Sequence, residues 1–372
     1  MACIMVSSSS RVSKVPRRSQ LDNAKDSVDQ ASLKDYYREA GKSKNTHDSY
    51  TSALKHYLEV WDGGVDHACP LLPASPSMIS SYIVSLAGKV KVSTIRHRLT
   101  ALSKWHESQG FYNPVHSQEV KEVIKGVAKM HHTAPKQAPA LTFDHLKAIC
   151  DRLEAQKILA IESEQQADIL RIHRDLALIL VGFWKGFRSD ELSRVEAEKV
   201  KFYPGHGMEI FLSHSKTDTE ALGKTHFMQS LRLYCPADAL QRWLELSGIN
   251  SGPVFRGVDR WGGVSKVGIN KRTIEHVLNR VSGGLFDSSL KFSTHSLRRG
   301  FADWATNAGW SMNSMMDHVG WKSPASAQRY MPVKKDFGVL TLASPQPPLF
   351  VGVETASGAT FVASHSQIDE NE

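Results

Sequence analysis

Hydrophobic residues recur every three or four positions through most of residues 31–130, and this spacing predicts amphipathic α-helices. Ser75 followed by Pro76 is a favourable helix start, because serine caps the N-terminus and proline suits the first turn. Ser93 is expected to cap another helix, and Gly110 to end it. The predicted helices lie near 33–37 and over 46–61, 76–86, 93–110 and 115–130. The pattern therefore predicts a compact all-helical domain.

The second half of the chain also begins with helices, but its hydrophobic period then changes. Alternating residues over 200–203 and 208–212 flank Pro-Gly-His-Gly, which predicts a β-hairpin, and 225–233 can add a third strand. Helices are predicted over 143–153 with Thr142 as cap, and over 168–187, 236–246, 271–281, 296–308 and 311–319. The expected fold class is mainly α with a small antiparallel β-sheet, in which a helical domain is joined to a mixed α/β domain.

Composition divides the chain into five expected segments. Residues 1–30 are rich in serine and basic residues with few apolar ones, which is typical of a flexible basic arm before the helical domain over 31–130. Residues 131–141 hold two prolines and two adjacent histidines, and we interpret them as a linker, since no cysteine or carboxylate cluster accompanies the histidines. The second domain is expected over 142–332. Residues 333–372 are expected to be a tail that packs elsewhere or stays loose.

The charge is unevenly distributed. The chain has 46 Lys plus Arg against 38 Asp plus Glu, a net charge of +8. Residues 1–140 hold 19 basic and 12 acidic residues, a net +7, whereas the remainder holds 27 and 26. A basic half joined to a nearly neutral half favours a nucleic-acid-binding module attached to something else, although a generally basic surface is the alternative.

The chain has features of a cytoplasmic protein. It contains no apolar run long enough to cross a membrane, and its basic N-terminus is a poor secretory signal. The four cysteines are scattered without a CxxC pair, which fits a reducing compartment. We therefore expect a cytoplasmic protein, associated with the nucleoid if the host is bacterial.

Four polar motifs in the second domain carry candidate chemistry. They are GFRSDEL at 186–192, HSKTD at 214–218, THSLRRGFA at 294–302, and VGWKS at 319–323 followed by Arg329-Tyr330. Each motif alone is weak, because an H-x-x-R pattern is common and most single arginines lie on solvated faces. The ordered set is far more specific than any of its members.

This ordered set resembles the tyrosine recombinase (phage integrase) family. His295-x-x-Arg298 matches the family's H-x-x-R box, and Gly320-Trp321 followed by Tyr330 matches its Gly-His/Trp…Tyr element. The resemblance covers residues 142–332 with specific motifs and extends more weakly over 31–130.

The spacing of the motifs is most similar to the Cre-type branch. Arg188 and Lys216 are 28 residues apart, Arg298 and Trp321 are 23 apart, and Trp321 and Tyr330 are 9 apart. Tryptophan also stands where histidine is commoner in the family.

The resemblance implies an enzyme of DNA recombination and integration in a mobile element. Such an enzyme closes as a C-shaped clamp on double-stranded DNA that carries a specific recombination site. It acts as a homo-tetramer on two synapsed sites and exchanges strands through a covalent 3′-phosphotyrosyl intermediate and a Holliday junction. Neither metal nor ATP is implied as a cofactor, while accessory proteins are possible partners. The tail over 333–372 is then a candidate for docking on a neighbouring protomer.

The residue types fit the roles that the resemblance implies. Two arginines can hold the phosphate oxygens, a histidine can relay the tyrosine proton, an indole N–H can donate to the phosphate, and a lysine can protonate the departing oxygen. The implied catalytic set is Arg188, Lys216, His295, Arg298, Trp321 and the nucleophile Tyr330, with Glu191 orienting the site from behind. Lys224 competes with Lys216, because it also follows the hairpin, and we interpret His318 as structural or peripheral.

Further basic residues are candidates for DNA contact. Arg96, Arg98 and Lys104 share the basic face of one predicted helix, and Arg299 adjoins the H-x-x-R box. Two other functions stay open at this point. One is DNA relaxation in the manner of a type IB topoisomerase, and the other is a DNA-binding accessory protein on the same scaffold that no longer cuts.

Overall fold

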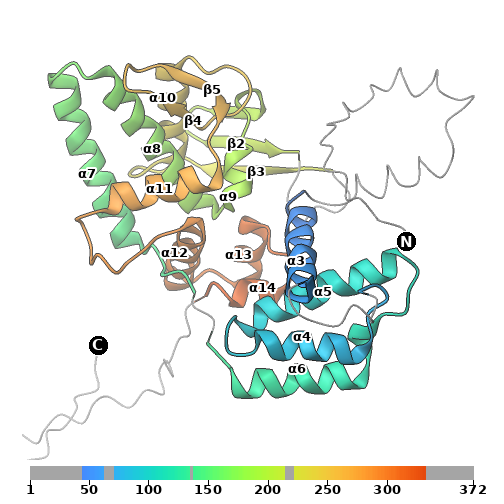
Figure 1. The fold of residues 1–372 in the computed structure, drawn as a ribbon. Coiled ribbons are helices and arrows are strands. Elements are labelled where there is room, and N and C mark those ends of the chain that lie inside the picture. The colour runs from blue at the N-terminus through green and yellow to red at the C-terminus, as the bar shows by residue number, and fades with distance from the viewer. Residues whose placement is uncertain (1–43, 63–70, 135–136, 214–221, 332–372) are drawn as a thin grey trace, which may run out of the picture. The chain divides into compact units, whose positions relative to one another are not determined.

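The computed structural model describes residues 44–62, 71–134, 137–213 and 222–331, and it divides the chain between positions 136 and 137 into two compact units (Figure 1). This division falls inside the segment 131–141 that the sequence assigns to a linker. The predicted arm, the predicted helix near 33–37 and the predicted tail lie outside the described residues.

The N-terminal unit is helical, as predicted from the sequence. Its elements are α3 (Lys44–Asp62), α4 (Pro76–Leu86), α5 (Val92–Ser108), the 3₁₀ turn η1 (Pro114–His116) and α6 (Gln118–Met130). The Ser75 hydroxyl caps α4 by accepting a hydrogen bond from the Met78 N–H, and Pro76 occupies the first turn. Tyr57 and Tyr82 pack edge to face at 5.0 Å in a core of apolar side chains from all four α-helices.

Two predicted helix starts in this unit are wrong. Helix α5 begins at Val92, before the predicted cap Ser93, and no side chain caps it. The helix expected over 115–130 is interrupted, because the Ser117 hydroxyl accepts from the Val120 N–H and starts α6 there. Local hydrogen bonds from side chains to the backbone compete with continuation of the helix. The hydrophobic period does not reveal such bonds, so it does not predict the break.

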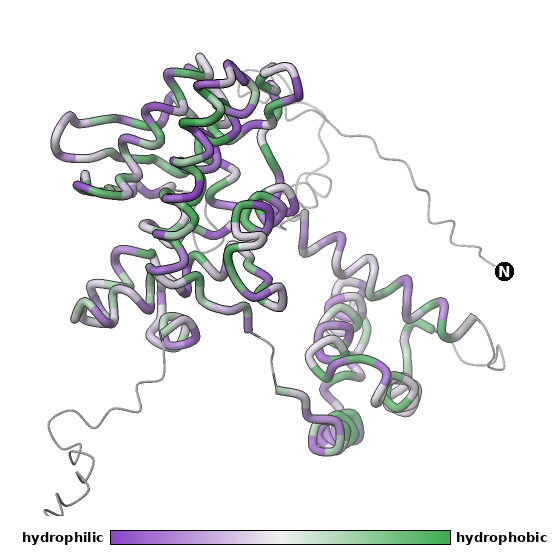
Figure 2. Tube along the Cα trace, turned by 90° about the vertical axis from the view of Figure 1, so that its left-hand side faces the viewer, coloured by the Kyte–Doolittle hydropathy of each residue, from purple (hydrophilic) through white to green (hydrophobic). Residues whose placement is uncertain are grey.

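The C-terminal unit is built around one buried helix, α8 (Gln166–Lys185), which packs against α7 (Phe143–Glu162), α10 (Pro236–Ser247) and α12 (Thr294–Asn307). The remaining helices are α9 (Ser189–Ser193), the 3₁₀ turn η2 (Ala197–Lys199), α11 (Lys271–Ser282), α13 (Met312–Val319) and α14 (Pro324–Gln328). Figure 2 shows hydrophobic and hydrophilic residues alternating along the helices of both units, as expected for amphipathic helices around a core.

The predicted hairpin forms one edge of a small antiparallel sheet. Strands β1 (Val200–Tyr203), β2 (Gly207–Leu212) and β3 (Lys224–Gln229) lie in the order β1-β2-β3. Gly207 has a φ of 140°, and a Cβ there would lie 2.1 Å from the Met228 carbonyl oxygen, so the close pairing with β3 requires glycine.

Some elements of this unit were not predicted. Strands β4 (Arg256–Val258) and β5 (Val264–Gly268) form a second hairpin, which is short and irregular in register and therefore lacks a clean alternation. Helix α7 continues nine residues beyond the predicted end at Leu153. The hydrophobic pattern did not predict these last turns, because they place apolar side chains such as Ile158 and Leu159 on the surface. No described helix is long and apolar enough to cross a membrane.

Gly300 lets the chain enter the C-terminal unit across α12. The Leu141 N–H donates to the Ser296 carbonyl at 3.0 Å, and a Cβ on Gly300 would lie 1.7 Å from the Leu141 carbonyl oxygen. Because α12 also carries His295 and Arg298, this crossing fixes the helix that holds two of the six predicted catalytic residues.

We predict that Gly300→Ala destabilises the C-terminal unit by about 3 kcal/mol, because the new methyl group must displace backbone rather than a flexible side chain. Urea unfolding of the full chain measures the change. Gly126→Ala in α6 is the control, since nothing lies within 4 Å of its Cβ position. That helical substitution should stabilise by about 0.4–1 kcal/mol. An unchanged unfolding transition for Gly300→Ala would contradict the close crossing.

Candidate active site

The junction between α8 and α9 holds Arg188 in place. Helix α8 ends at Gly186, whose φ of 61° is the left-handed conformation that favours glycine, and Arg188 is the residue before α9. The buried Glu191 carboxylate accepts from the Arg188 backbone N–H at 2.8 Å and from its Nη1 at 2.6 Å. One carboxylate therefore fixes both the backbone and the guanidinium of Arg188.

Arg298 lies beside this junction and is completely buried. It is on α12 three residues after His295, so the two side chains leave the same side of the helix. Its Nη1 donates to the Gly186 carbonyl oxygen at 2.7 Å and lies 3.9 Å from Glu191 Oε2. Glu191 therefore stands between the two guanidinium groups, and the trio keeps a net charge of +1.

Two aromatic rings cover the Arg298 guanidinium. Helix α13 ends at Gly320 with a left-handed φ of 77°, which turns the chain so that Trp321 packs inward. The guanidinium carbon lies 5.0 Å from the centre of the Trp321 ring and 5.4 Å from that of Tyr330. The two rings stack on each other with centres 5.5 Å apart. Arginine, tryptophan and tyrosine thus form one contiguous group.

Three N–H donors in this group are buried and have no acceptor among the residues that the structure describes: Arg298 Nε, Arg298 Nη2 and Trp321 Nε1. Buried donors are nearly always paired, because an unpaired one carries a desolvation penalty of about 1–3 kcal/mol. Adjacent donors that lack acceptors beside a net positive charge are suited to the oxygens of an anion.

The side chains of His295 and Tyr330 are in direct contact. The Tyr330 hydroxyl lies 3.1 Å from His295 Nδ1, and the rings stack with an interplanar angle of 26°. Desolvation lowers the pKa of His295, and the positive charges of Lys271, Arg298 and Arg188 lower it further. The neutral imidazole that results at neutral pH can accept the phenolic proton.

The guanidinium of Arg298 stays charged despite its burial. Burial and the neighbouring charge of Arg188 lower its pKa to about 10, which is still well above neutral pH. A cation held out of water acts on a bound anion through a weakly screening medium. The site therefore provides a permanent positive charge next to an uncharged proton acceptor.

Of the two lysines that follow the hairpin, Lys216 lies outside the described residues. Lys224 begins β3 and is exposed, and its Nζ donates to the Asp317 carbonyl at 3.5 Å. The same Nζ lies 3.9 Å from the position of a Cβ on Gly320. Lys224 thus reaches the turn that carries Trp321.

The candidate DNA-contact residues differ in their surroundings. Arg96 is exposed, whereas the exposed Lys104 is paired with Glu107 at 2.8 Å. Arg98 is half-buried and lies close to Tyr82 inside the N-terminal unit. Arg299 is also half-buried and bonds through Nη1 to Gln137, at the start of the C-terminal unit. Arg96 and Lys104 are therefore the two exposed cations of the four.

The sequence analysis interpreted His318 as structural or peripheral, but it did not identify two other buried basic residues behind the site, Lys185 and His226. His318 donates from Nε2 to the Trp184 carbonyl at 2.7 Å and stacks on Phe301, which gives it a packing role. Lys185 and His226 are both buried next to the end of α8. The available signal for Lys185 was its position in the apolar run LILVGFWKGF, where a charged residue is unusual.

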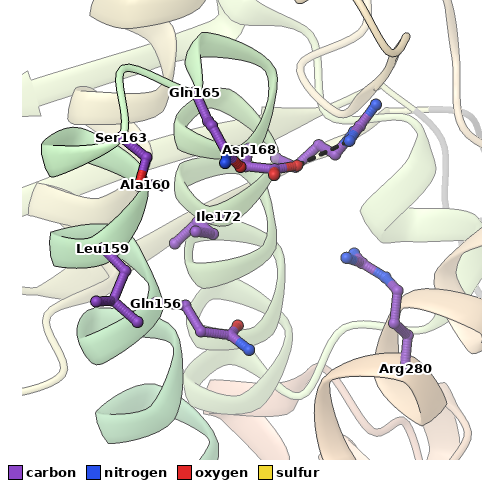
Figure 3. A pocket seen from close by; sticks show the side chains of 9 residues that line it. Gln156, Leu159, Ala160, Ser163, Gln165, Asp168, Ile172 and Arg280 are labelled. Atoms are coloured by element: carbon purple, nitrogen blue, oxygen red, sulfur yellow. Dashed lines mark hydrogen bonds and ion pairs between the residues drawn. The ribbon is translucent and has the colours of Figure 1, made fainter.

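A pocket of about 340 Å³ lies at the opposite end of α8, about 30 Å of helix from Lys185 (Figure 3). It is bounded by α7, the start of α8, and Arg280 of α11. Its arginines are paired, Arg171 with Asp168 and Arg280 with the buried Asp175. The pocket contains none of the predicted site residues.

Comparison with known sequences gives three matches. A model of the phage integrase family matches residues 150–336. The chain is 28% identical over 290 residues to an integrase/recombinase, a XerD homologue of Selenomonas ruminantium, covering 75% of this chain and 81% of that protein. It is 25% identical over 276 residues to the Cre recombinase of Escherichia phage P1, covering 70% of this chain and 76% of Cre.

Solved structures share the fold. A lambda integrase dimer bound to a COC′ core site matches with a TM-score of 0.52 and 18% identity, covering 86% of this chain and 81% of that one. The Tn1549 transposon integrase in complex with transposon right end DNA matches with a TM-score of 0.51 and 13% identity, covering 81% and 93%. At these identities the likeness concerns the fold.

We predict that the stability of the C-terminal unit falls as the pH drops from 6.5 towards 4. Burial and the charge of Lys185 lower the pKa of His318 to about 4, so the unfolded chain binds a proton there that the folded chain does not. The contribution is complete above pH 6.5 and is lost as the pH falls through this window, at about 1.4 kcal/mol per pH unit for one histidine.

Urea unfolding at pH 7, 6 and 5 measures this dependence. His318→Gln removes the titrating group but retains an N–H donor for the Trp184 carbonyl, so its stability should fall less steeply with decreasing pH. His206→Gln, in the exposed turn between β1 and β2, controls for the loss of a histidine. An identical slope for His318→Gln and the unchanged chain would rule out this source of pH dependence.

Proposed function

Because the chain belongs to the phage integrase family, we propose that it is a site-specific DNA recombinase that cuts and rejoins strands through a covalent phosphotyrosyl intermediate. The catalytic residues in this proposal are Arg188, Lys216, His295, Arg298, Trp321 and Tyr330, with Glu191 as the carboxylate that orients both arginines. The observation that carries it is the group of three buried, unpaired donors next to the Tyr330–His295 hydrogen bond.

Cleavage begins at the Tyr330 hydroxyl. A phenol with a pKa of about 10 is a weak nucleophile until a base removes its proton, and His295 Nδ1 is within hydrogen-bonding distance. The phenolic oxygen forms a bond to the scissile phosphorus while the bond from phosphorus to the 5′ oxygen breaks. The product is a 3′-phosphotyrosyl linkage and a free 5′-hydroxyl, which Lys216 supplies with a proton.

The cationic group stabilises the transition state. Negative charge increases on the two non-bridging phosphate oxygens as the fifth bond forms, and the donors of Arg188, Arg298 and Trp321 are placed to receive them. The Tyr330 ring covers the Arg298 guanidinium, so a phosphate that reaches the guanidinium displaces the ring and brings the hydroxyl next to phosphorus. Binding and positioning of the nucleophile are thereby linked.

Rejoining reverses these steps with the 5′-hydroxyl of another strand. Each step exchanges one phosphodiester bond for another, so the energy of the broken strand is conserved and no ATP is consumed. We propose that four protomers on two synapsed sites carry out the exchanges in pairs through a Holliday junction. The exposed Arg96 of the N-terminal unit contacts the DNA backbone in this assembly, and such contacts make affinity strongly dependent on salt.

We predict that Tyr330→Phe binds the recombination site with unchanged affinity but forms no covalent complex. The substrate is a nicked duplex whose short strand diffuses away after cleavage. Its sequence is the one that wild type selects from a random duplex library by binding. Denaturing gels measure the trapped fraction. Covalent trapping by Tyr330→Phe would falsify the assignment of the nucleophile.

The same assay separates the two other functions. Wild type that binds the selected site without trapping would indicate a non-cutting DNA-binding protein. Relaxation of a supercoiled plasmid that lacks the site, without strand exchange, would indicate a topoisomerase-like enzyme. Recombination of two plasmid-borne sites is the result that the proposal requires.

We predict that Arg188→Ala and Arg298→Ala each slow cleavage about 10²–10³-fold, by analogy with the loss of one oxyanion donor. Arg194→Ala is the matched control, because Arg194 directly follows the same short helix, is about half-exposed and pairs with Asp190. Single-turnover cleavage of the nicked substrate gives the rates, and binding of intact DNA shows whether each variant is folded. A loss below fivefold for Arg298→Ala would exclude the buried guanidinium from the phosphate site.

A further inference from the structure

The turn between β4 and β5 exposes a tryptophan to which the proposed reaction assigns no role. Trp261 is 79% exposed, whereas Trp310, the next most exposed tryptophan among those whose side chains the structure describes, is 36% exposed. The guanidinium carbon of Arg260 lies 4.7 Å from the centre of the Trp261 ring. Tryptophan normally buries most of its large ring, so one that is almost fully exposed points to contact with a partner.

The turn that carries this ring is held in one conformation. The Asp259 carboxylate accepts hydrogen bonds from the backbone N–H groups of Trp261 and Gly263, both at 2.8 Å. Arg171 of α8 donates from Nη2 to the Asp259 carbonyl oxygen at 2.6 Å and so ties the turn to the buried helix. Because the turn is fixed in the free protein, little conformational entropy is lost when it binds a partner.

Exposed cations lead from this turn towards the active site. Residues 259–272 hold four basic side chains against the single acidic Asp259, a net charge of +3. The four form what we call the basic stripe, and all are exposed: Arg260, Lys266, Lys271 and Arg272. Lys271, which lies 4.0 Å from Glu275, begins α11. Burial and then the positive charge of Lys271 lower the pKa of His295, so this end of the stripe lies near the catalytic histidine.

The distance from the active site to the turn can be measured along α8. A Cβ on Gly262, in the turn, would lie 3.7 Å from the Ala167 backbone nitrogen near the start of the helix. From Ala167 to Lys185, at the active-site end, the helix is about 27 Å long at 1.5 Å per residue. That length corresponds to about eight base pairs, because successive phosphates of one strand are about 3.4 Å apart along the DNA axis.

We propose that Arg260 and Trp261 form a second contact with the DNA backbone, about eight base pairs from the scissile phosphate. One face of the indole packs on a deoxyribose, and the guanidinium held over the ring pairs with the adjoining phosphate. The inference rests on the proposed recombinase function, and the contact supplies affinity and register, not a chemical step. DNA is favoured over a protein partner, because a stripe of one sign that ends at the cleavage site matches a polyanion passing through that site.

Binding of one selected site by the full-length Tyr330→Phe chain, the parent, tests this contact without cleavage. Trp261→Ala is expected to weaken binding about tenfold, the effect of uncovering roughly 60 Å² of apolar surface. Its salt dependence should not change, because no charge is lost. Arg260→Gln is expected to lower the slope of log affinity against log salt by about 0.9, the value for one phosphate contact. Trp261→Phe retains an aromatic ring and should bind within about threefold of the parent.

The matched control is Arg242→Gln, because Arg242 is an exposed cation on α10 outside the basic stripe. This variant should keep both the affinity and the salt dependence of the parent. Hydroxyl-radical footprinting then locates the contact. The parent should protect the backbone about eight base pairs from the scissile phosphate, and Trp261→Ala and Arg260→Gln should lose protection there alone.

Each contrary result has a distinct meaning. Unchanged affinity and footprint for both Trp261→Ala and Arg260→Gln would overturn the contact. Normal binding of one protomer combined with weaker pairing of two protomers on a double site would assign the turn to a protein interface, and this also overturns the inference. Failure of the wild type to form a covalent complex rejects the proposed function separately, because that assay depends on Tyr330 and not on the turn.

Discussion

The site depends on keeping one guanidinium charged and out of water. Arg298 is completely buried, and the protein compensates for its desolvation with the Gly186 carbonyl, the Glu191 carboxylate and the faces of two aromatic rings. This compensation is incomplete within the described part of the chain, where two of its nitrogens find no acceptor. An anion that enters the site completes the set, so the energetic deficit of the free protein becomes binding energy for phosphate.

That arrangement explains why the functional residues gather at helix ends. The last carbonyls of α8 have no partner within the helix, so Trp184 accepts from His318 and Gly186 from Arg298. Left-handed glycines at the ends of α8 and α13 turn the chain sharply enough for Arg188 and Trp321 to reach the same place. Hydrogen bonds to the last carbonyls of one buried helix thereby hold α12 and α13 next to each other.

The electrostatic surroundings give neighbouring side chains different protonation states, with Arg298 charged and His295 neutral. The same positive charges that hold the phosphate in the proposed reaction lower the pKa of His295, and so keep it able to accept a proton. Glu191 moderates the repulsion between Arg188 and Arg298 without cancelling their combined charge. One cluster therefore holds a permanent cation and a neutral base within the same few residues, which a nucleophilic attack on a phosphate diester requires together.

The sequence by itself determined the fold class, most helices, the main hairpin and the identity of the candidate residues. Hydrophobic period, turn residues and motif order are properties of the sequence itself, so they can be recognised without knowledge of the tertiary contacts. Only the tertiary structure decided that Arg298 is buried beneath Trp321 and Tyr330, that Arg299 bonds to Gln137 within its own unit, and that Lys185 ties α8 to β3. Those facts depend on atoms far apart in the chain, whose energies of desolvation and pairing exist only once the helices pack.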